Sequence, residues 1–294
     1  MKRLALAWAS PDLSALALVF ALLAVDGLHF VFARALHAVL PPFTSVLFVM
    51  TTATAQVAVF AVAKGKLRWQ TFARHAPLFL IVGGLVAIST TANYIAVGFI
   101  DPGTAALLSQ TSVLFGLGFG LLWLREQLTR AQLIGAAICL TGAAIITFHP
   151  GDYFRLGSLM VIGSALLYAL HAAIVKRQAG QLDFVEFFAW RLISTTGFLL
   201  ISAALQGGLT WPKAEVWPLL IIAGTVDVVI SRSLYYLSLR RLKISLLALV
   251  LTLTPVVTIV WSLLLFGVQP TAQQFVGGAA VLAGVLIVTT RRAP

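Results

Sequence analysis

The chain is 294 residues long, with 60% hydrophobic residues, only 10% charged residues and a formal net charge of +11 at pH 7. A soluble domain carries about 25% charged residues, so this composition excludes an ordinary soluble globular protein. Apolar runs of about twenty residues, the length that crosses a hydrocarbon core of about 30 Å, recur along the whole chain. The sequence therefore predicts an all-α integral membrane protein embedded in a lipid bilayer. The positive charge then reflects membrane topology, and we expect no nucleic-acid partner.

Hydropathy and helix-boundary residues predict ten transmembrane helices. Proline and aspartate mark several starts and turns, at Pro11-Asp12, Pro41-Pro42 and Asp101-Pro102-Gly103. In chain order, the predicted spans are residues 13–33, 43–63, 76–97, 104–123, 131–148, 156–175, 184–205, 217–239, 244–266 and 273–290.

The second half of the chain repeats the first half at a constant offset of 142 residues. Gly135 and Gly142, for example, return as Gly277 and Gly284. The same offset pairs Tyr94 with Tyr236, His29 with His171, Gln127 with Gln269 and Gln132 with Gln274. We therefore predict two five-helix repeats, over residues 1–148 and 149–294, that together form one transport domain. An odd number of spans in each repeat inverts the second repeat relative to the first.

The distribution of Lys and Arg supports this inverted arrangement. With the N-terminus placed in the cytoplasm, fifteen of the twenty Lys and Arg residues fall in inner segments. Three fall in outer loops, and the remaining two, Arg191 and Arg232, lie within spans. This bias predicts a multi-pass protein of a bacterial inner membrane with both termini in the cytoplasm. Inverted repeats are typical of secondary transporters, which bind substrate near the midplane between the repeats.

Polar and ionisable side chains within the spans are candidates for function, because their burial in a bilayer is costly. Asp26 and His29 lie three residues apart on one face of the first span, and Tyr168 and His171 occupy the equivalent positions in the repeat. These residues form a substrate or proton site, or each His is simply satisfied by a backbone carbonyl. Asp26, Asp227 and His171 are the candidates for proton coupling.

Span 217–239 carries both Asp227 and Arg232. They are five positions apart, a spacing that does not place two side chains on one face of an α-helix, so we expect each to pair with another helix. Arg232 is a candidate for carboxylate binding, for gating or for a structural ion pair. We expect structural or gating roles for Arg191 and Pro255. The candidate substrate-binding residues are Asp26, His29, Asn93, Tyr94, Gln110, Tyr168, His171, Asp227, Arg232, Tyr235 and Tyr236.

Motifs of soluble enzymes are absent. The sequence contains no GxxxxGK[ST] phosphate loop, no HExxH and no GxSxG. Its single cysteine, Cys139, cannot form a disulfide within the chain or a thiolate metal cluster. We therefore expect no cofactor, no metal site and no enzymatic activity.

The stretch Leu-Leu-Trp-Leu-Arg-Glu-Gln-Leu-Thr at residues 121–129, followed by Gln132, Gly135 and Gly142, resembles the EamA-type members of the drug/metabolite transporter superfamily. The resemblance covers essentially the whole chain. It implies ten helices in two inverted five-helix repeats around a central cavity. Within that group the chain is most similar to the YddG-type exporters of aromatic and other amino acids. The second repeat departs from the family pattern at Gly267-Val268, which favours a structural role for Glu126.

These features predict a secondary transporter that works as a monomer by alternating access. Its expected substrates for export are amino acids, aromatic ones included, and other small amphipathic metabolites. A zwitterion needs one partner of each sign, here Asp26 and Arg232, and tyrosine rings for stacking. The alternatives are an organic-cation or drug exporter with Asp26 as its cation site, a sugar-phosphate exchanger, or a membrane enzyme. Proton antiport and facilitated diffusion both remain open.

Overall fold

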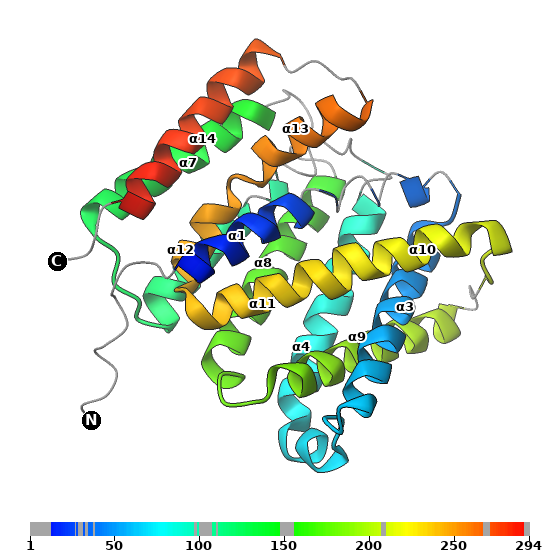
Figure 1. Ribbon diagram of the computed structural model, residues 1–294. Coiled ribbons are helices and arrows are strands. Elements are labelled where there is room, and N and C mark those ends of the chain that lie inside the picture. The colour runs from blue at the N-terminus through cyan, green and yellow to red at the C-terminus, as the bar shows by residue number, and fades with distance from the viewer. Residues whose placement is uncertain are drawn as a thin grey trace, which may run out of the picture.

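The computed structural model describes residues 13–26, 28, 32, 35–37, 39–96, 99, 108, 109, 111–147, 156–206, 210–266 and 271–290. These residues form a bundle of helices (Figure 1) and include no β-strand. The predicted all-α class is confirmed.

The helices of the first half are α1 (Leu13–Asp26), α3 (Pro42–Ala63), α4 (Trp69–Ala96), α6 (Thr111–Gly118), the π-helix η1 (Phe119–Trp123) and α7 (Arg130–Thr147). Those of the second half are α8 (Leu156–Gln178), α9 (Phe184–Gln206), the 3₁₀ turn η2 (Ala214–Val216), α10 (Trp217–Ala223), the π-helix η3 (Gly224–Ile230), α11 (Ser231–Arg241), α12 (Ile244–Leu251), α13 (Thr254–Phe266) and α14 (Ala272–Thr290). Among the described residues, five helical stretches are long and apolar enough to cross a membrane: Pro42–Ala63, Trp69–Ala96, Leu156–Gln178, Phe184–Leu205 and Ala214–Arg241.

Helix α4 differs from the predicted span because it begins at Trp69, not near residue 76. Pro77 has no N–H to donate, and the backbone leaves helical geometry nearby, at His75 (φ −118°, ψ 21°), before the helix continues. The proline therefore kinks the helix without ending it. Arg74, which the predicted spans 43–63 and 76–97 leave in the loop between them, lies inside this first part of α4.

The predicted span 244–266 is interrupted near its middle. Helix α12 ends at Leu251, and the N–H groups of Thr252 and Leu253 donate to carbonyls only three residues earlier, at 3.2 and 3.0 Å. Pro255 is the second residue of α13 and cannot donate to the carbonyl of Leu251, which an unbroken helix would require. The break divides the span into two short helices beside the central cavity described below.

Two contacts between helices join residues to their own counterparts in the other repeat. The hydroxyls of Thr54 in α3 and Thr196 in α9 lie 2.7 Å apart, and the Cys139 thiol in α7 donates to the Val281 carbonyl in α14 at 3.7 Å. The residues of each pair are 142 positions apart in the chain, the offset of the sequence repeat. A residue contacts its own counterpart in the other repeat only near a twofold axis. The pseudo-twofold axis of the repeats therefore passes between α3 and α9 and between α7 and α14.

Helices α7 and α14 pack side by side (Figure 1), with their glycines at the contact. A Cβ atom at Gly142 would lie 2.7 Å from the carbonyl oxygen of Gly277, and a Cβ at Gly284 would lie 2.7 Å from that of Gly135. The two contacts are equivalent under the 142-residue offset. Small residues allow the two backbones to approach this closely, as in other packed membrane helices.

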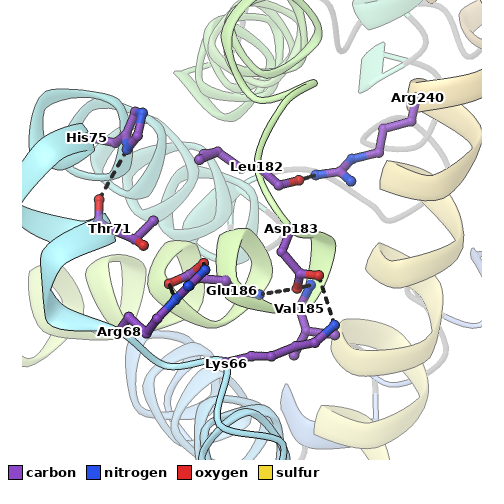
Figure 2. Close-up of polar contacts among 9 residues, drawn as sticks. All are labelled: Lys66, Arg68, Thr71, His75, Leu182, Asp183, Val185, Glu186 and Arg240. Carbon is purple, nitrogen blue, oxygen red and sulfur yellow. Dashed lines mark hydrogen bonds and ion pairs between the residues drawn. The ribbon is translucent and has the colours of Figure 1, made fainter.

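One end of the bundle, which we call the basic end, holds the loops with Lys66, Arg68 and Lys243. Helix α3 ends there in a Schellman motif, in which Gly65 takes a positive φ of 62° and the N–H of Lys66 donates to the carbonyl of Ala61 at 2.8 Å. The chain then turns toward the start of α9, as Figure 2 shows. Lys66 Nζ lies 2.8 Å from Asp183 Oδ2, and Arg68 Nη2 lies 3.0 Å from Glu186 Oε2.

Further bonds at the basic end also cross between the two halves of the chain. Glu126 accepts hydrogen bonds from the backbone N–H groups of Ile244 and Ser245 at 2.9 and 3.1 Å, at the start of α12. Lys243 Nζ donates to the carbonyl of Gln127 at 2.8 Å. The side chain of Glu126 therefore satisfies free N–H groups at a helix start, which agrees with the structural role expected for it.

Asp183 is the N-cap of α9, and its Oδ1 accepts the N–H groups of Val185 and Glu186 at 3.0 and 3.2 Å. The hydrogen bond from Lys66 is the largest influence on its carboxyl group and lowers its pKa. A lowered folded-state pKa contributes stability above the unfolded pKa, and this stability is lost as the pH falls through the folded-state pKa. Because asparagine also caps helices, Asp183→Asn removes mainly the charge. We expect the variant to melt slightly below the wild type at pH 7, by about 1 kcal/mol or less.

Thermal unfolding in detergent between pH 3 and pH 7 measures this effect. The difference in melting temperature between wild type and Asp183→Asn should shrink as the pH falls below the ordinary aspartate pKa of about 3.9 and through the lower pKa of the folded state. A difference that stays constant over this range would contradict the assignment.

Candidate functional site

A cavity of about 190 Å³ lies within the bundle and is lined by both halves of the chain. Helices α1, α3, α4 and α6 line it from the first half, and α8, α9, η3, α11, α12 and α13 from the second. Its polar lining comprises Asp26, Ser89, Thr90, Asn93, Tyr94, Ser109, Ser112, Ser164, Tyr168, Arg191, Asp227, Arg232, Tyr235 and Thr254. This volume is below the roughly 300–1,000 Å³ of sites for drug-sized ligands, so the cavity suits a smaller molecule.

Three charged side chains meet in the cavity wall, and we call them the charge cluster. Arg232 Nη2 lies 3.3 Å from Asp26 Oδ1 and 3.7 Å from Asp227 Oδ1. Arg232 Nη1 also donates to the hydroxyl of Tyr168 at 2.7 Å. The cluster thus joins α1, η3 and α11 to α8 and places two carboxylates against one guanidinium.

The expectation that Asp227 and Arg232 do not share a helix face is wrong, although Arg232 does also pair with another helix, through Asp26 on α1. The cause is the π-helix η3, whose end is marked by the bond from the N–H of Ser231 to the carbonyl of Val226, five residues earlier. In a π-helix the bonds run from i to i+5, so residues five apart come onto one face. Such π-helical segments occur frequently at functional sites, and here the segment forms one side of the charge cluster.

A cluster of aromatic rings adjoins the charge cluster. The ring centroids of Tyr168 and His171 are 4.5 Å apart, those of Tyr168 and Tyr235 are 5.7 Å apart, and those of Tyr235 and Tyr236 are 5.5 Å apart. Tyr168 and Tyr235 line the cavity, whereas His171 and Tyr236 are fully buried behind them.

The hydrogen bonds of His171 define its tautomer. Nδ1 lies 2.6 Å from the carbonyl of Tyr168, which can only accept, so Nδ1 carries a proton. In the neutral ring, Nε2 then accepts from the hydroxyl of Tyr236 at 3.0 Å. The backbone carbonyl of its own helix thus satisfies one side of His171, and the ring serves to hold Tyr236 in place.

The other predicted site residues divide into two groups. Asn93 and Tyr94 on α4 line the cavity, and Asn93 Oδ1 is buried with no hydrogen-bond partner among the described residues. His29 and Gln110 lie outside the described residues. Sequence reasoning did not single out Ser112, Ser164 or Thr254, which also line the cavity. Isolated hydroxyls in apolar spans are a weak signal, because many of them only bond to carbonyls of their own helix.

Arg191 lies in the cavity wall on α9, although only 1% of its surface is exposed. Its Nε and Nη1 atoms have no hydrogen-bond partner within the described part of the chain, and no ion pair is found for it there. Its guanidinium carbon lies 5.7 Å from the centroid of the Tyr236 ring. Arg191 and Arg232 therefore face the same cavity in very different states of pairing.

Two proteins with similar sequences are transporters by name. A protein from Streptantibioticus cattleyicolor named "Probable terminal-alkyne amino-acid exporter" is 26% identical over 247 residues, a match that covers 82% of each chain. A riboflavin transporter from Vibrio cholerae is 33% identical over 121 residues, which is 40% of each chain. These similarities indicate a small-molecule transporter and not an enzyme.

Structure comparison identifies the fold, and a family model identifies the family. A protein of known crystal structure shares this fold with a TM-score of 0.80 at 18% sequence identity, over 94% of this chain and 98% of that one. The model of the EamA-like transporter family matches twice, over residues 13–148 and 155–290. The two matches together span nearly the whole sequence, and the chain therefore belongs to the EamA-like transporter family.

Proposed function

We propose that this protein exports amino acids and similar small zwitterionic metabolites from the cytoplasm across a bacterial inner membrane. The observation that carries this proposal is the composition of the cavity wall. Asp26 and Asp227 supply negative charge, Arg191 and Arg232 supply positive charge, and the Tyr168 and Tyr235 rings supply apolar surface. A zwitterion with an apolar side chain needs all three. The amino-acid exporter among the relatives supports the same substrate class.

The transport cycle is alternating access within a single chain, because both repeats contribute to one cavity. The positive-inside rule places the basic end, and both termini, in the cytoplasm. Bonds such as Lys66–Asp183 and Glu126–Ser245 then hold the repeats together on the cytoplasmic side. Opening the cavity to the cytoplasm requires these bonds to break while the pseudo-twofold contacts rearrange.

Uptake of radiolabelled phenylalanine into proteoliposomes tests the substrate class. We expect saturable uptake that unlabelled aromatic amino acids inhibit, and at least tenfold slower uptake in Tyr235→Ala, which loses ring contact with the substrate. A pH step across the membrane tests coupling. Uptake that the pH step accelerates, and that is abolished in Asp26→Asn, indicates proton antiport. An uptake rate that the pH step does not change indicates facilitated diffusion.

An organic-cation exporter is the second candidate, because the charge cluster sets two carboxylates against one guanidinium and so carries a net charge of −1. Lipid-only vesicles are the control, and riboflavin and an organic cation complete the panel of substrates. Flux of the cation without flux of phenylalanine would reject the amino-acid proposal in favour of this candidate.

A further inference from the structure

We propose that Arg191, and not Arg232, binds the anionic group of the substrate. The inference rests on the proposed function for the identity of the substrate. The anion site itself is argued from the contacts of the two arginines.

Arg232 has little capacity left for a substrate carboxylate. Its guanidinium faces Asp26 at 3.3 Å and Asp227 at 3.7 Å, and it donates to Tyr168 at 2.7 Å. A third carboxylate at this position would be repelled by the two already present. The cluster as a whole is negative, so it suits the ammonium group of a substrate better than the carboxylate.

Arg191 has the opposite properties. Two of its donor nitrogens are buried without a hydrogen-bond partner among the described residues, and the residue lines the cavity at 1% exposure. A buried cation whose donors are only partly satisfied is costly, and this cost favours a role in which a ligand supplies the missing acceptors. A carboxylate accepts from two guanidinium nitrogens at once, which matches the free donors of Arg191.

The surroundings of Arg191 hold its guanidinium in position. Phe187, Phe188 and Leu192 on the same helix are buried, and α9 packs against both α3 and α4. The Tyr236 ring lies beside the guanidinium at 5.7 Å, and its hydroxyl is bonded to His171. A cation next to an aromatic face retains its free N–H groups for a ligand, and a fixed ring limits the entropy that binding must remove.

Tyrosine rings adjoin both arginines of the cavity wall. Arg191 contacts Tyr236, while the guanidinium carbon of Arg232 lies 5.6 Å from the Tyr168 ring centroid. The rings of Tyr168, Tyr235 and Tyr236 form a continuous series of contacts between these two points. The carboxylate of the substrate would bind at Arg191, and the buried Asn93 Oδ1 in the same cavity wall is an acceptor open to the ammonium group.

A series of ligands separates the contribution of the carboxylate to binding from that of the ammonium group. Phenylalanine carries both charges, phenylalaninamide lacks the carboxylate, and 3-phenylpropanoate lacks the ammonium group. Binding is measured by calorimetry and ligand-induced thermal shift on purified wild type, Arg191→Gln, Arg191→Lys and the control Arg74→Gln, an exposed arginine outside the cavity.

We expect Arg191→Gln to lower the affinity for phenylalanine and 3-phenylpropanoate by about 10- to 100-fold, as for the loss of a charge-assisted hydrogen bond. The affinity for phenylalaninamide should be unchanged. The affinity of Arg191→Lys for these two ligands should lie between those of the wild type and Arg191→Gln, because an ammonium group does not bind a carboxylate in a bidentate manner. Arg74→Gln should match the wild type. If Arg191→Gln does not fold, the lysine variant decides: a loss confined to the carboxylate ligands supports the inference, and an equal loss for the amide overturns it.

Stability without ligand distinguishes binding from a structural role. If Arg191 serves a ligand, Arg191→Gln should melt at or above the wild-type temperature, because the variant removes a buried charge that no carboxylate compensates among the described residues. A lower melting temperature together with an unchanged preference for phenylalanine over its amide would overturn the inference while amino-acid transport stands. Conversely, Arg191-dependent binding of 3-phenylpropanoate without amino-acid flux would retain the anion site and reject the proposed function.

Discussion

Replacing Arg232 by glutamine should unfold or inactivate the protein more severely than any other single change in the cavity. The Arg232 guanidinium lies 3.3 Å from Asp26 and 3.7 Å from Asp227. The substitution removes this positive charge and leaves the two carboxylates without a compensating cation. Breaking a buried ion pair by removing one partner costs about 3–5 kcal/mol, because the remaining charge is uncompensated. We expect a corresponding fall in thermal stability in detergent and loss of measurable transport in proteoliposomes.

A double-mutant cycle tests whether this cost comes from charge imbalance. Asp227→Asn removes one of the two carboxylates, so the double variant Asp227→Asn/Arg232→Gln should be more stable than Arg232→Gln alone by about 1–3 kcal/mol. The two side chains lie 3.7 Å apart, and η3 is the segment that brings them onto one face. If the two substitutions are additive, the ion pair in the structure contributes nothing and the π-helical alignment has no energetic consequence.

The second large effect is expected at the crossing of α7 and α14. Gly142→Ala would place a Cβ atom 2.7 Å from the carbonyl oxygen of Gly277, and backbone atoms cannot move aside as a flexible side chain would. Forcing extra atoms into a packed contact costs about 1–3 kcal/mol, and valine at the same position should cost more. Gly284→Ala should have a similar effect, because its Cβ would meet Gly135 in the equivalent way.

Gly163→Ala in α8 is the matched control, since no heavy atom lies within 4 Å of the Cβ position there. This change should be neutral or stabilising by up to about 1 kcal/mol, because alanine favours the helix. Thermal unfolding of the three variants under one detergent condition gives the comparison. Similar melting temperatures for Gly142→Ala and Gly163→Ala would mean that α7 and α14 do not approach as closely as described.

The repeat is the feature that sequence predicted most fully. The 142-residue offset, visible in Gly135 and Gly277, reappears in space as the self-contacts Thr54–Thr196 and Cys139–Val281. Most predicted span boundaries agree with the helix boundaries in the structure within a few residues. They were predictable because the bilayer sets the apolar length, and because proline and charge mark where a helix begins or ends.

The cavity residues were only partly predictable. Asp26, Tyr168 and Arg232 were named because ionisable and aromatic groups are costly or unusual inside a membrane. Their mutual pairing was not predicted, because the position of Asp227 relative to Arg232 depends on a π-helix. A helix that changes from i→i+4 to i→i+5 bonds does so in response to packing against its neighbours, and five residues of spacing do not reveal it.

Sequence alone determined that this chain spans a membrane as two related halves, because composition, apolar length and repetition are local or periodic properties. It also determined which residue types are available to a substrate. Only the tertiary structure decided how they are used: Arg232 is neutralised by two carboxylates from different helices, whereas Arg191 enters the cavity wall with donors to spare. The state of a buried charge depends on which partners the fold brings within a few ångströms, and the order of residues along the chain does not contain that distance.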